Sequence, residues 1–173
     1  MAADTTISKA PDARFLLSHP AHFIALGFGS GLAPRAPGTF GTLAALAIFL
    51  VLEQVMAPWI VGALAIPLFF AGVWASEVTA RDLGVQDHGA IVIDEIAAFL
   101  PVCVFANKSP LMLAVAFGLF RLFDIWKPFP IRQVERRVKG GLGVMADDVL
   151  AAIYACAVIA LLVFASHKYL ETT

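Results

Sequence analysis

Four long apolar segments constrain the fold of this chain more than any other feature of its sequence. They cover residues 43–56, 59–74, 91–123 and 149–165. Each continues far beyond the usual length of a β-strand, so the sequence predicts an all-α fold. Of all residues, 60% are apolar and 14% are charged, whereas soluble domains have about 45–50% and about 25%. This excess of apolar residues predicts a helical membrane protein.

The lengths of the segments predict a single helical bundle with about four hydrophobic segments. A helix that crosses a bilayer needs about 20 apolar residues. Residues 149–165 fit this length best, and the first two segments fit only with their flanks. The third segment is interrupted by a turn-like Asn-Lys-Ser-Pro at 107–110, so we expect its halves to form a shallow hairpin. The number of full crossings stays open.

The chain of 173 residues is long enough for one domain. Its first 20 residues carry two prolines and mixed charge, unlike the basic and apolar regions of a signal peptide. We therefore expect a flexible lead-in over residues 1–22, a single domain over residues 23–168 and a short tail over residues 169–173.

Basic side chains indicate how the bundle is oriented. If the first two segments form one hairpin and the third forms another, the N-terminal loop, residues 76–95 and residues 121–148 emerge on one face. All lysines and arginines lie on that face except Lys108 and Lys168. Cytoplasmic loops carry an excess of these residues, so the face is predicted to be cytoplasmic.

Charge and cysteine spacing exclude several classes of function. The net charge of −1 provides no basic field for a nucleic acid, so we expect no such partner. Cys103 and Cys156 lie in apolar segments without the spacing of a zinc site. Neither is followed six residues later by the arginine of a cysteine-based phosphatase. We interpret both as buried, inert thiols.

A glycine-rich stretch, GFGSGLAPRAPGTFGTLAA, begins at residue 27 and leads into an apolar helix expected to start near Thr42. Glycine lets backbone N–H groups converge on an anion, and a helix N-terminus favours phosphate. The stretch matches neither a dinucleotide fingerprint nor a P-loop, and a Gly/Pro hinge before a membrane helix is the alternative. The candidates for phosphate binding are Gly29, Ser30, Gly31, Thr39 and Thr42.

Two further motifs combine acids with apolar surroundings. In QDHGAIVIDEIAAFLP, Asp94 and Glu95 lie between apolar runs, which favours a metal or acid/base role over simple solvation. In FRLFDIWKPFPI, the charged residues Arg121, Asp124 and Lys127 recur every three residues and are expected to share one helical face. They form either an ion-pair ladder or a site in which Asp124 binds a metal and the two cations bind phosphate.

A fourth motif, RRVKGGLGVMADDVLAAIYA, places Asp147 and Asp148 at the expected start of the last helix. Acids there can simply stabilise a helix N-terminus. However, acids begin three apolar segments on the same predicted face of the membrane. Together they supply the oxygen ligands that Mg²⁺ prefers, which are carboxylates, waters and phosphate.

Taken together and in order, four motifs resemble the phosphatidylglycerophosphatase A family over residues 27–155. These motifs are GFGSGLAPRAPGTFGT, DHGAIVIDE, LFRLFDIWKPFPI and GGLGVMADD. The resemblance implies a Mg²⁺-dependent phosphatase that converts phosphatidylglycerophosphate into phosphatidylglycerol and inorganic phosphate. It also implies an all-α core packed around a central helix. We therefore expect a multi-pass protein of the bacterial cytoplasmic (inner) membrane, with its active site facing the cytoplasm.

The resemblance also implies roles for matching residues. The expected metal ligands are Asp94, Glu95, Asp124, Asp147 and Asp148. The expected catalytic residues are Asp94, Glu95, Asp124, Lys127 and Asp148. Arg121 and Lys127 are expected to bind the substrate phosphate beside the glycine-rich stretch. Attack by water and formation of an aspartyl-phosphate both remain open, as do the oligomeric state and the number of metal ions.

Three other interpretations are weighed against this one. An ion-coupled transporter predicts carboxylates near the middle of membrane helices, whereas these lie at segment ends. A non-catalytic membrane protein would use the same acids only to cap helices. A CDP-alcohol phosphotransferase should carry a DG followed by an AR within one acidic helix, and the sequence has none.

Overall fold

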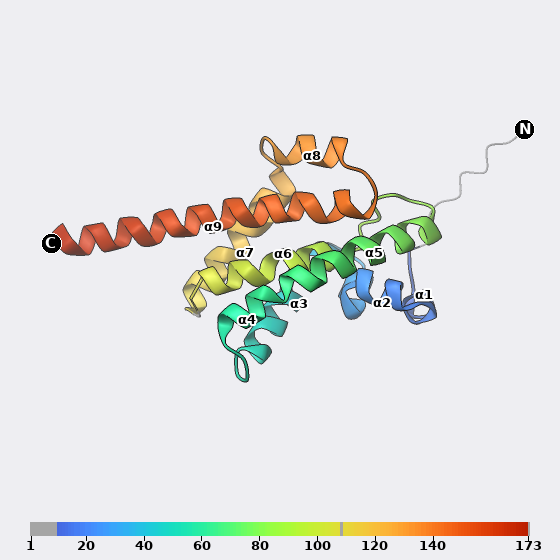
Figure 1. Ribbon diagram of the computed structural model, residues 1–173, viewed down its shortest axis with the longest axis horizontal. Coiled ribbons are helices and arrows are strands. Elements are labelled where there is room, and N and C mark those ends of the chain that lie inside the picture. The colour runs from blue at the N-terminus through green and yellow to red at the C-terminus, as the bar shows by residue number, and fades with distance from the viewer. Residues whose placement is uncertain (1–9, 108, 173) are drawn as a thin grey trace, which may run out of the picture.

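A computed structural model describes residues 10–107 and 109–172, and every regular element in these ranges is helical. The prediction of an all-α fold is therefore confirmed for this part of the chain. In chain order the elements are α1 (Ala13–Ser18), α2 (Pro20–Ala25), the 3-10 helix η1 (Gly27–Leu32), α3 (Pro37–Leu52), α4 (Pro58–Ala63), α5 (Ala65–Leu83), α6 (Ile93–Phe105), α7 (Pro110–Trp126), α8 (Ile131–Arg137) and α9 (Gly140–Thr172) (Figure 1).

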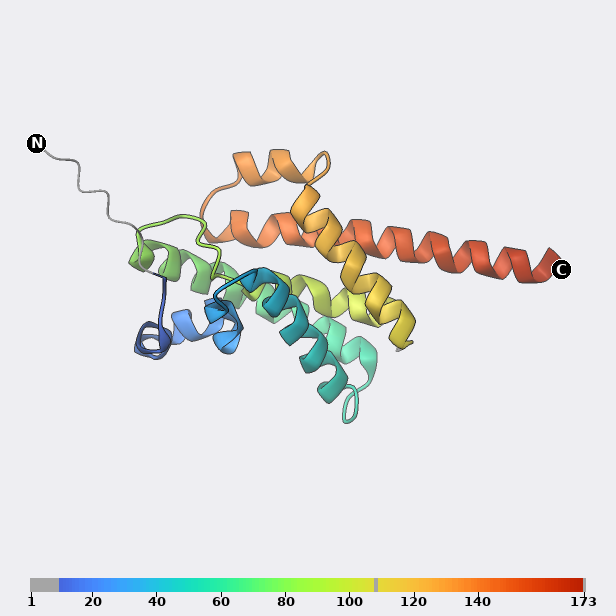
Figure 2. The same ribbon diagram turned by 180° about the vertical axis from the view of Figure 1, so that it is seen from behind.

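Helix α6 is the most enclosed of the long helices. It packs against α3, α4, α5, α7 and α9, and nine of its 13 residues are buried. A helix that is apolar all round is normally buried in this way. The ring of Phe99 lies 5.2 Å from that of Phe120 on α7, which fixes these two helices against each other. Figure 2 shows α3 and α7 on the face opposite to α5.

Several helix boundaries differ from those expected. Helix α3 starts at Pro37, five residues before the expected start near Thr42, because Ala36 in a left-handed conformation (φ 49°) is followed by a proline suited to the first helical turn. The second apolar segment is broken at Leu64 into α4 and α5, and α5 continues to Leu83. The third segment forms two helices, α6 and α7, as the turn-like residues at 107–110 predicted.

Helix α9 also begins earlier than expected, at Gly140. The carboxylate of Glu77 on α5 accepts a hydrogen bond from the N–H of Gly141 at 2.7 Å, which satisfies a free donor of the first turn. Asp147 and Asp148 therefore lie about two turns inside the helix. They cannot cap its N-terminus, so the capping interpretation is wrong for this pair.

The N-terminal residues pack on the bundle through a polar cluster. Residues 13–18 form α1 within the predicted lead-in, and α2 (residues 20–25) continues past its expected end at residue 22, whereas residues 1–9 lie outside the described part. His22 is buried, and its Nε2 lies 2.9 Å from Oδ2 of Asp82 on α5. Its ring stacks on Phe15 at 4.0 Å. These contacts tie α1 and α2 to α5.

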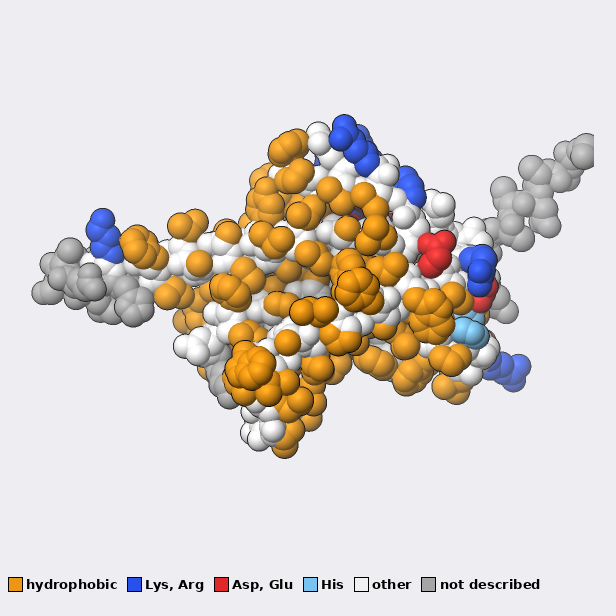
Figure 3. Space-filling view, in the orientation of Figure 1, with side chains coloured by type: hydrophobic (Ala, Val, Ile, Leu, Met, Phe, Trp, Pro, Cys, Tyr) orange, Lys and Arg blue, Asp and Glu red, His pale blue; other side chains and the backbone are white. Residues whose placement is uncertain are grey.

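Two stretches of the described chain are long and apolar enough to cross a membrane. They are Pro58–Leu83, formed by α4 and α5, and Gly140–Ser166 within α9, while α3 is shorter. Hydrophobic side chains cover most of the surface in Figure 3, and charged ones gather mainly at one end and along its upper edge. The described part of the chain is thus all-helical with two candidate membrane spans, and the predicted number of about four membrane segments is not reached by length alone.

Candidate active site

Three carboxylates from two helices converge where α6 meets α9. Asp94 and Glu95 occupy the first turn of α6, and Asp148 lies on α9. One oxygen of each lies within 4.8 Å of the others. Glu95 and Asp148 are 8% and 3% exposed, and Asp94 is half-buried. The sequence predicted all three acids, and the packing of α6 on α9 brings them together.

One oxygen of each acid has no hydrogen-bond partner within the described chain. These are Oδ1 of Asp94, Oε2 of Glu95 and Oδ2 of Asp148. Buried charged oxygens without partners are costly, and several acids side by side repel one another. A divalent cation would relieve both costs, and an all-oxygen donor set suits a hard cation such as Mg²⁺. The residues present therefore fit a metal site.

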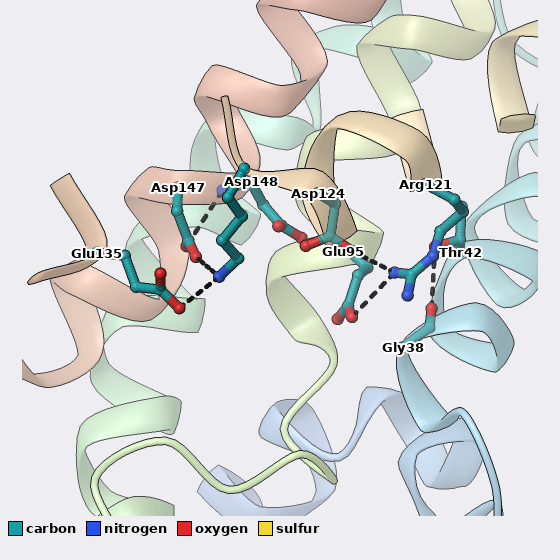
Figure 4. Close-up of polar contacts among 9 residues, drawn as sticks. Gly38, Thr42, Glu95, Arg121, Asp124, Glu135, Asp147 and Asp148 are labelled. Atoms are coloured by element: carbon teal, nitrogen blue, oxygen red, sulfur yellow. Dashed lines mark hydrogen bonds and ion pairs between the residues drawn. The ribbon is translucent and has the colours of Figure 1, made fainter. Parts of the chain in front are cut away.

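Arg121 of α7 connects two of the predicted acids (Figure 4). Its Nη1 lies 2.7 Å from Oδ2 of Asp124 and 3.4 Å from Oε1 of Glu95. The pairing of Arg121 with Asp124 confirms that these two residues share one helical face. All three side chains are at most 14% exposed, so the contacts are shielded from solvent and orient the Glu95 carboxylate.

Lys127 does not continue this face, which corrects the prediction for the third motif. Helix α7 ends at Trp126, and Lys127 takes a left-handed conformation (φ 47°) before Pro128, which disfavours helix at the preceding residue. Its Nζ donates hydrogen bonds to Asp147 at 2.6 Å and to Glu135 at 2.7 Å. Burial alone would lower the pKa of Lys127, but these hydrogen bonds outweigh it and raise the pKa above its usual value.

Glu135 was not predicted from the sequence. It lies on α8 within a basic run, where a single acid is typical of a solvated surface. In the structure its Oε1 accepts a second hydrogen bond from Nζ of Lys127, beside the one accepted by Asp147. Only its position eight residues after Lys127, beyond the Pro-Phe-Pro turn, could have indicated this contact.

The acids and Lys127, but not Arg121, line one cavity of about 370 Å³, a size within the usual range for ligand sites. Its walls include all five predicted acids, Lys127 and Glu135. Arg136 and Lys139 add positive charge from the segment before α9. The cavity thus combines a group of carboxylates with lysine and arginine side chains that can attract an anionic headgroup.

The glycine-rich stretch reaches the site at a different residue from those predicted. The N–H groups of Gly29 and Gly31 both donate to the carbonyl of Leu26 at 3.0 Å, and Ser30 Oγ donates to Gly27 at 2.8 Å. Thr39 lies inside α3, as does Thr42, whose hydroxyl donates to the carbonyl of Gly38 at 2.9 Å. None of the five predicted residues lines the acidic cavity, and their role in phosphate binding stays a prediction.

Gly38 is the residue of this stretch that meets the site. A Cβ atom there would collide with Oε1 of Glu95 and lie 3.0 Å from Nη1 of Arg121. The first turn of α3 can approach this ion pair only because residue 38 has no side chain (Figure 4). The sequence marked Gly38 as part of a glycine-rich stretch but not as a contact of the acids.

The helical fold with its two candidate membrane spans and the buried acids beside Arg121 and Lys127 are the features of an enzyme equipped for phosphate chemistry. The chain belongs to the phosphatidylglycerophosphatase A family, whose model matches residues 23–163. This confirms the resemblance inferred from the four motifs.

Two curated relatives agree with this assignment. The chain is 39% identical to phosphatidylglycerophosphatase A of Escherichia coli K12, with 90% of this chain and 89% of the relative covered. It is 41% identical to phosphatidylglycerophosphatase A of Haemophilus influenzae, with 86% and 92% covered. No solved structure matches the chain.

Proposed function

We propose that this protein hydrolyses the terminal phosphomonoester of phosphatidylglycerophosphate, releasing phosphatidylglycerol and inorganic phosphate, with Mg²⁺ held by its acidic cluster. The family and its relatives support the reaction. The metal site is supported by three converging carboxylates, each of which has a buried oxygen without a hydrogen-bond partner in the described chain.

Asp94, Glu95 and Asp148 are the proposed metal ligands, with Asp124 and Asp147 beside them in the same cavity. When bound, Mg²⁺ supplies positive charge that withdraws electrons from the phosphate and favours attack at phosphorus. Arg121 is a positioning residue, since its contacts with Glu95 and Asp124 hold these carboxylates in place.

Lys127 is the proposed phosphate-binding cation. Asp147 and Glu135 direct its Nζ into the cavity while leaving one of its three N–H donors for a ligand. This donor would bind a phosphate oxygen and stabilise the charge that develops during phosphoryl transfer. Asp124, which lines the cavity outside the proposed ligand set, is the candidate to accept a proton from attacking water.

The same residues indicate how the protein sits in the membrane. We place the acidic cavity on the cytoplasmic side of a multi-pass bundle with α6 as its central helix. Supporting this, Arg81, Arg136 and Lys139 lie near the cavity end, where charged side chains gather in Figure 3. Single cysteines placed near Gly31, Arg81 and Gly140 should react from one side only; labelling from opposite sides would contradict this topology.

The function is tested by phosphate release from phosphatidylglycerophosphate by the purified protein in detergent. We expect release with Mg²⁺ and none with excess EDTA, because the cluster needs its cation. Release that is equal in both conditions would refute the role of the metal. No release from protein shown to be folded would refute the proposed reaction.

A further inference from the structure

An apolar groove lies directly beside the acidic cavity. It has a volume of about 520 Å³ and runs between α5, α6 and α9. Only Ala, Val, Ile, Phe, Pro and Cys side chains line it. Figure 3 shows hydrophobic side chains over the surface between α5 and α9. The proposed reaction uses only the polar cavity and leaves this groove without a role.

Helix α6 joins the groove to the acids along one of its faces. Asp94 is followed at i+3, i+4, i+7 and i+11 by Ala97, Ala98, Pro101 and Phe105, all of which line the groove. Residues at these spacings share one side of a helix. The acid and the groove residues therefore form one continuous stripe, with the carboxylate at its end.

Helix α9 repeats this arrangement. Asp148 is followed at i+4 and i+8 by Ala152 and Cys156, which line the groove. The neighbouring Val149 and Ile153 form part of its wall. Helices α6 and α9 thus each carry a proposed metal ligand at one end and residues of the apolar groove along the same face.

The shape of the groove fits a chain rather than a packed side chain. Its floor is made of small residues, since Ala97, Ala98 and Ala152 are 3%, 4% and 7% exposed. Its rim is made of large ones that reach outward, with Phe70 68% and Ile153 57% exposed. The groove is therefore open at the surface of the bundle, between these exposed side chains.

The acid and the groove residues of α6 together span about the depth of one leaflet. From Asp94 to Phe105 the α6 axis rises roughly 16 Å, at about 1.5 Å per residue. Half of a hydrocarbon core is about 15 Å thick. A chain that starts at the acidic cavity can therefore follow the groove to about the middle of the bilayer.

From these observations we infer that the groove binds one acyl chain of the lipid substrate while the phosphate headgroup occupies the acidic cavity. This inference rests on the proposed function and adds a subsite for the diacylglycerol part. Its apolar lining and its continuity with the two acids that are proposed to act on the headgroup favour this occupant over a second copy of the protein.

The test compares two substrates in purified protein. One is a diacyl phosphatidylglycerophosphate, and the other is its water-soluble deacylated headgroup. Ala152→Phe fills the floor of the groove, and Ala152→Leu does so partly. The matched control is Leu161→Phe, because Leu161 is 67% exposed on the same helix and does not line the groove.

We expect Ala152→Phe to lower the ratio of kcat/KM for the diacyl substrate to kcat/KM for the headgroup at least tenfold. Ala152→Leu should lower it less, and Leu161→Phe should leave it as in the native protein. Equal losses on both substrates, or no loss on either, would overturn the inference. If the native protein hydrolysed neither substrate, the proposed function itself would fail.

A binding measurement tests the same groove without relying on turnover. A phosphatidylglycerophosphate with a photoreactive group on one acyl chain should label residues of α5, α6 and α9 that line the groove. Excess unlabelled substrate should remove this label, whereas phosphatidylcholine should not. Uniform labelling of the apolar surface would overturn the inference. So would a change in oligomeric state on Ala152→Phe, which would identify the groove as a contact between copies.

Discussion

Two buried polar clusters in this protein differ in whether their atoms are satisfied. Around His22, Nε2 contacts Asp82 at 2.9 Å, and Nδ1 lies 3.0 Å from Ser18 Oγ and 3.1 Å from the carbonyl of Phe15. Around Asp94 and Asp148, by contrast, buried oxygens have no partner in the described chain. Buried polar atoms without a hydrogen-bond partner are rare, and a bound ligand or ion is one explanation for them.

This difference separates structure from function within one fold. The His22 cluster is complete by itself and ties the N-terminal helices to α5. The acidic cluster is incomplete by itself and is closed by Mg²⁺ and substrate in the proposed function. Substitutions in the two clusters should therefore have opposite effects on activity and stability.

The largest effect on activity is expected for Asp94→Asn. The amide keeps the shape of the side chain but removes one charge from the cluster, so phosphate release should fall by roughly a hundredfold to a thousandfold. In EDTA, thermal unfolding should occur at the same or a higher temperature, because less like charge is buried. Normal turnover by this variant would remove Asp94 from the active site.

An intermediate effect is expected for Gly38→Ala. The added Cβ would collide with Glu95 and crowd Arg121, so overpacking should destabilise the fold by about 1–3 kcal/mol and reduce turnover as well. The matched control is Gly118→Ala, because a Cβ at this helical position meets nothing within 4 Å. The control should retain activity and stability; equal behaviour of both variants would show that the close approach of α3 is unimportant.

The smallest effect on activity is expected for His22→Ala. The substitution leaves Asp82 without its histidine and should lower the free energy of unfolding by about 1–3 kcal/mol. The kcat and KM of folded protein should stay at native values, since no atom of His22 lines the acidic cavity. A large fall in kcat with unchanged stability would show that the complete cluster also serves catalysis.

The sequence predicted the fold class and all of the clustered acids because these depend on local patterns. Long apolar runs define helices, and acids next to such runs stand out. Predictions from the sequence were wrong where contacts between distant residues determine the local structure. Glycine disfavours helix interiors, so the Gly-Gly-Leu-Gly run suggested a loop. In the structure Glu77 satisfies Gly141, and the helix starts at that run.

Contacts between distant residues also decide where Lys127 points and which glycine meets the acids. Spacing alone suggested that Lys127 continues the face of Arg121, yet the following proline ends the helix and turns Lys127 toward Asp147 and Glu135. Which glycine of the glycine-rich stretch meets the acids depends on how α3 packs against α6 and on where the Arg121 side chain lies. No feature of the sequence distinguishes Gly38 from its neighbours in this respect.

The most direct test of the acidic cluster is calorimetric titration of Mg²⁺ into metal-free protein in detergent, with Asp94→Asn and Asp148→Asn titrated in parallel. The proposed site predicts saturable binding by the native protein and a loss of that binding in both variants while they remain folded. Mg²⁺ binding that is unchanged in both variants, or absent from native protein that still releases phosphate in EDTA, would contradict it.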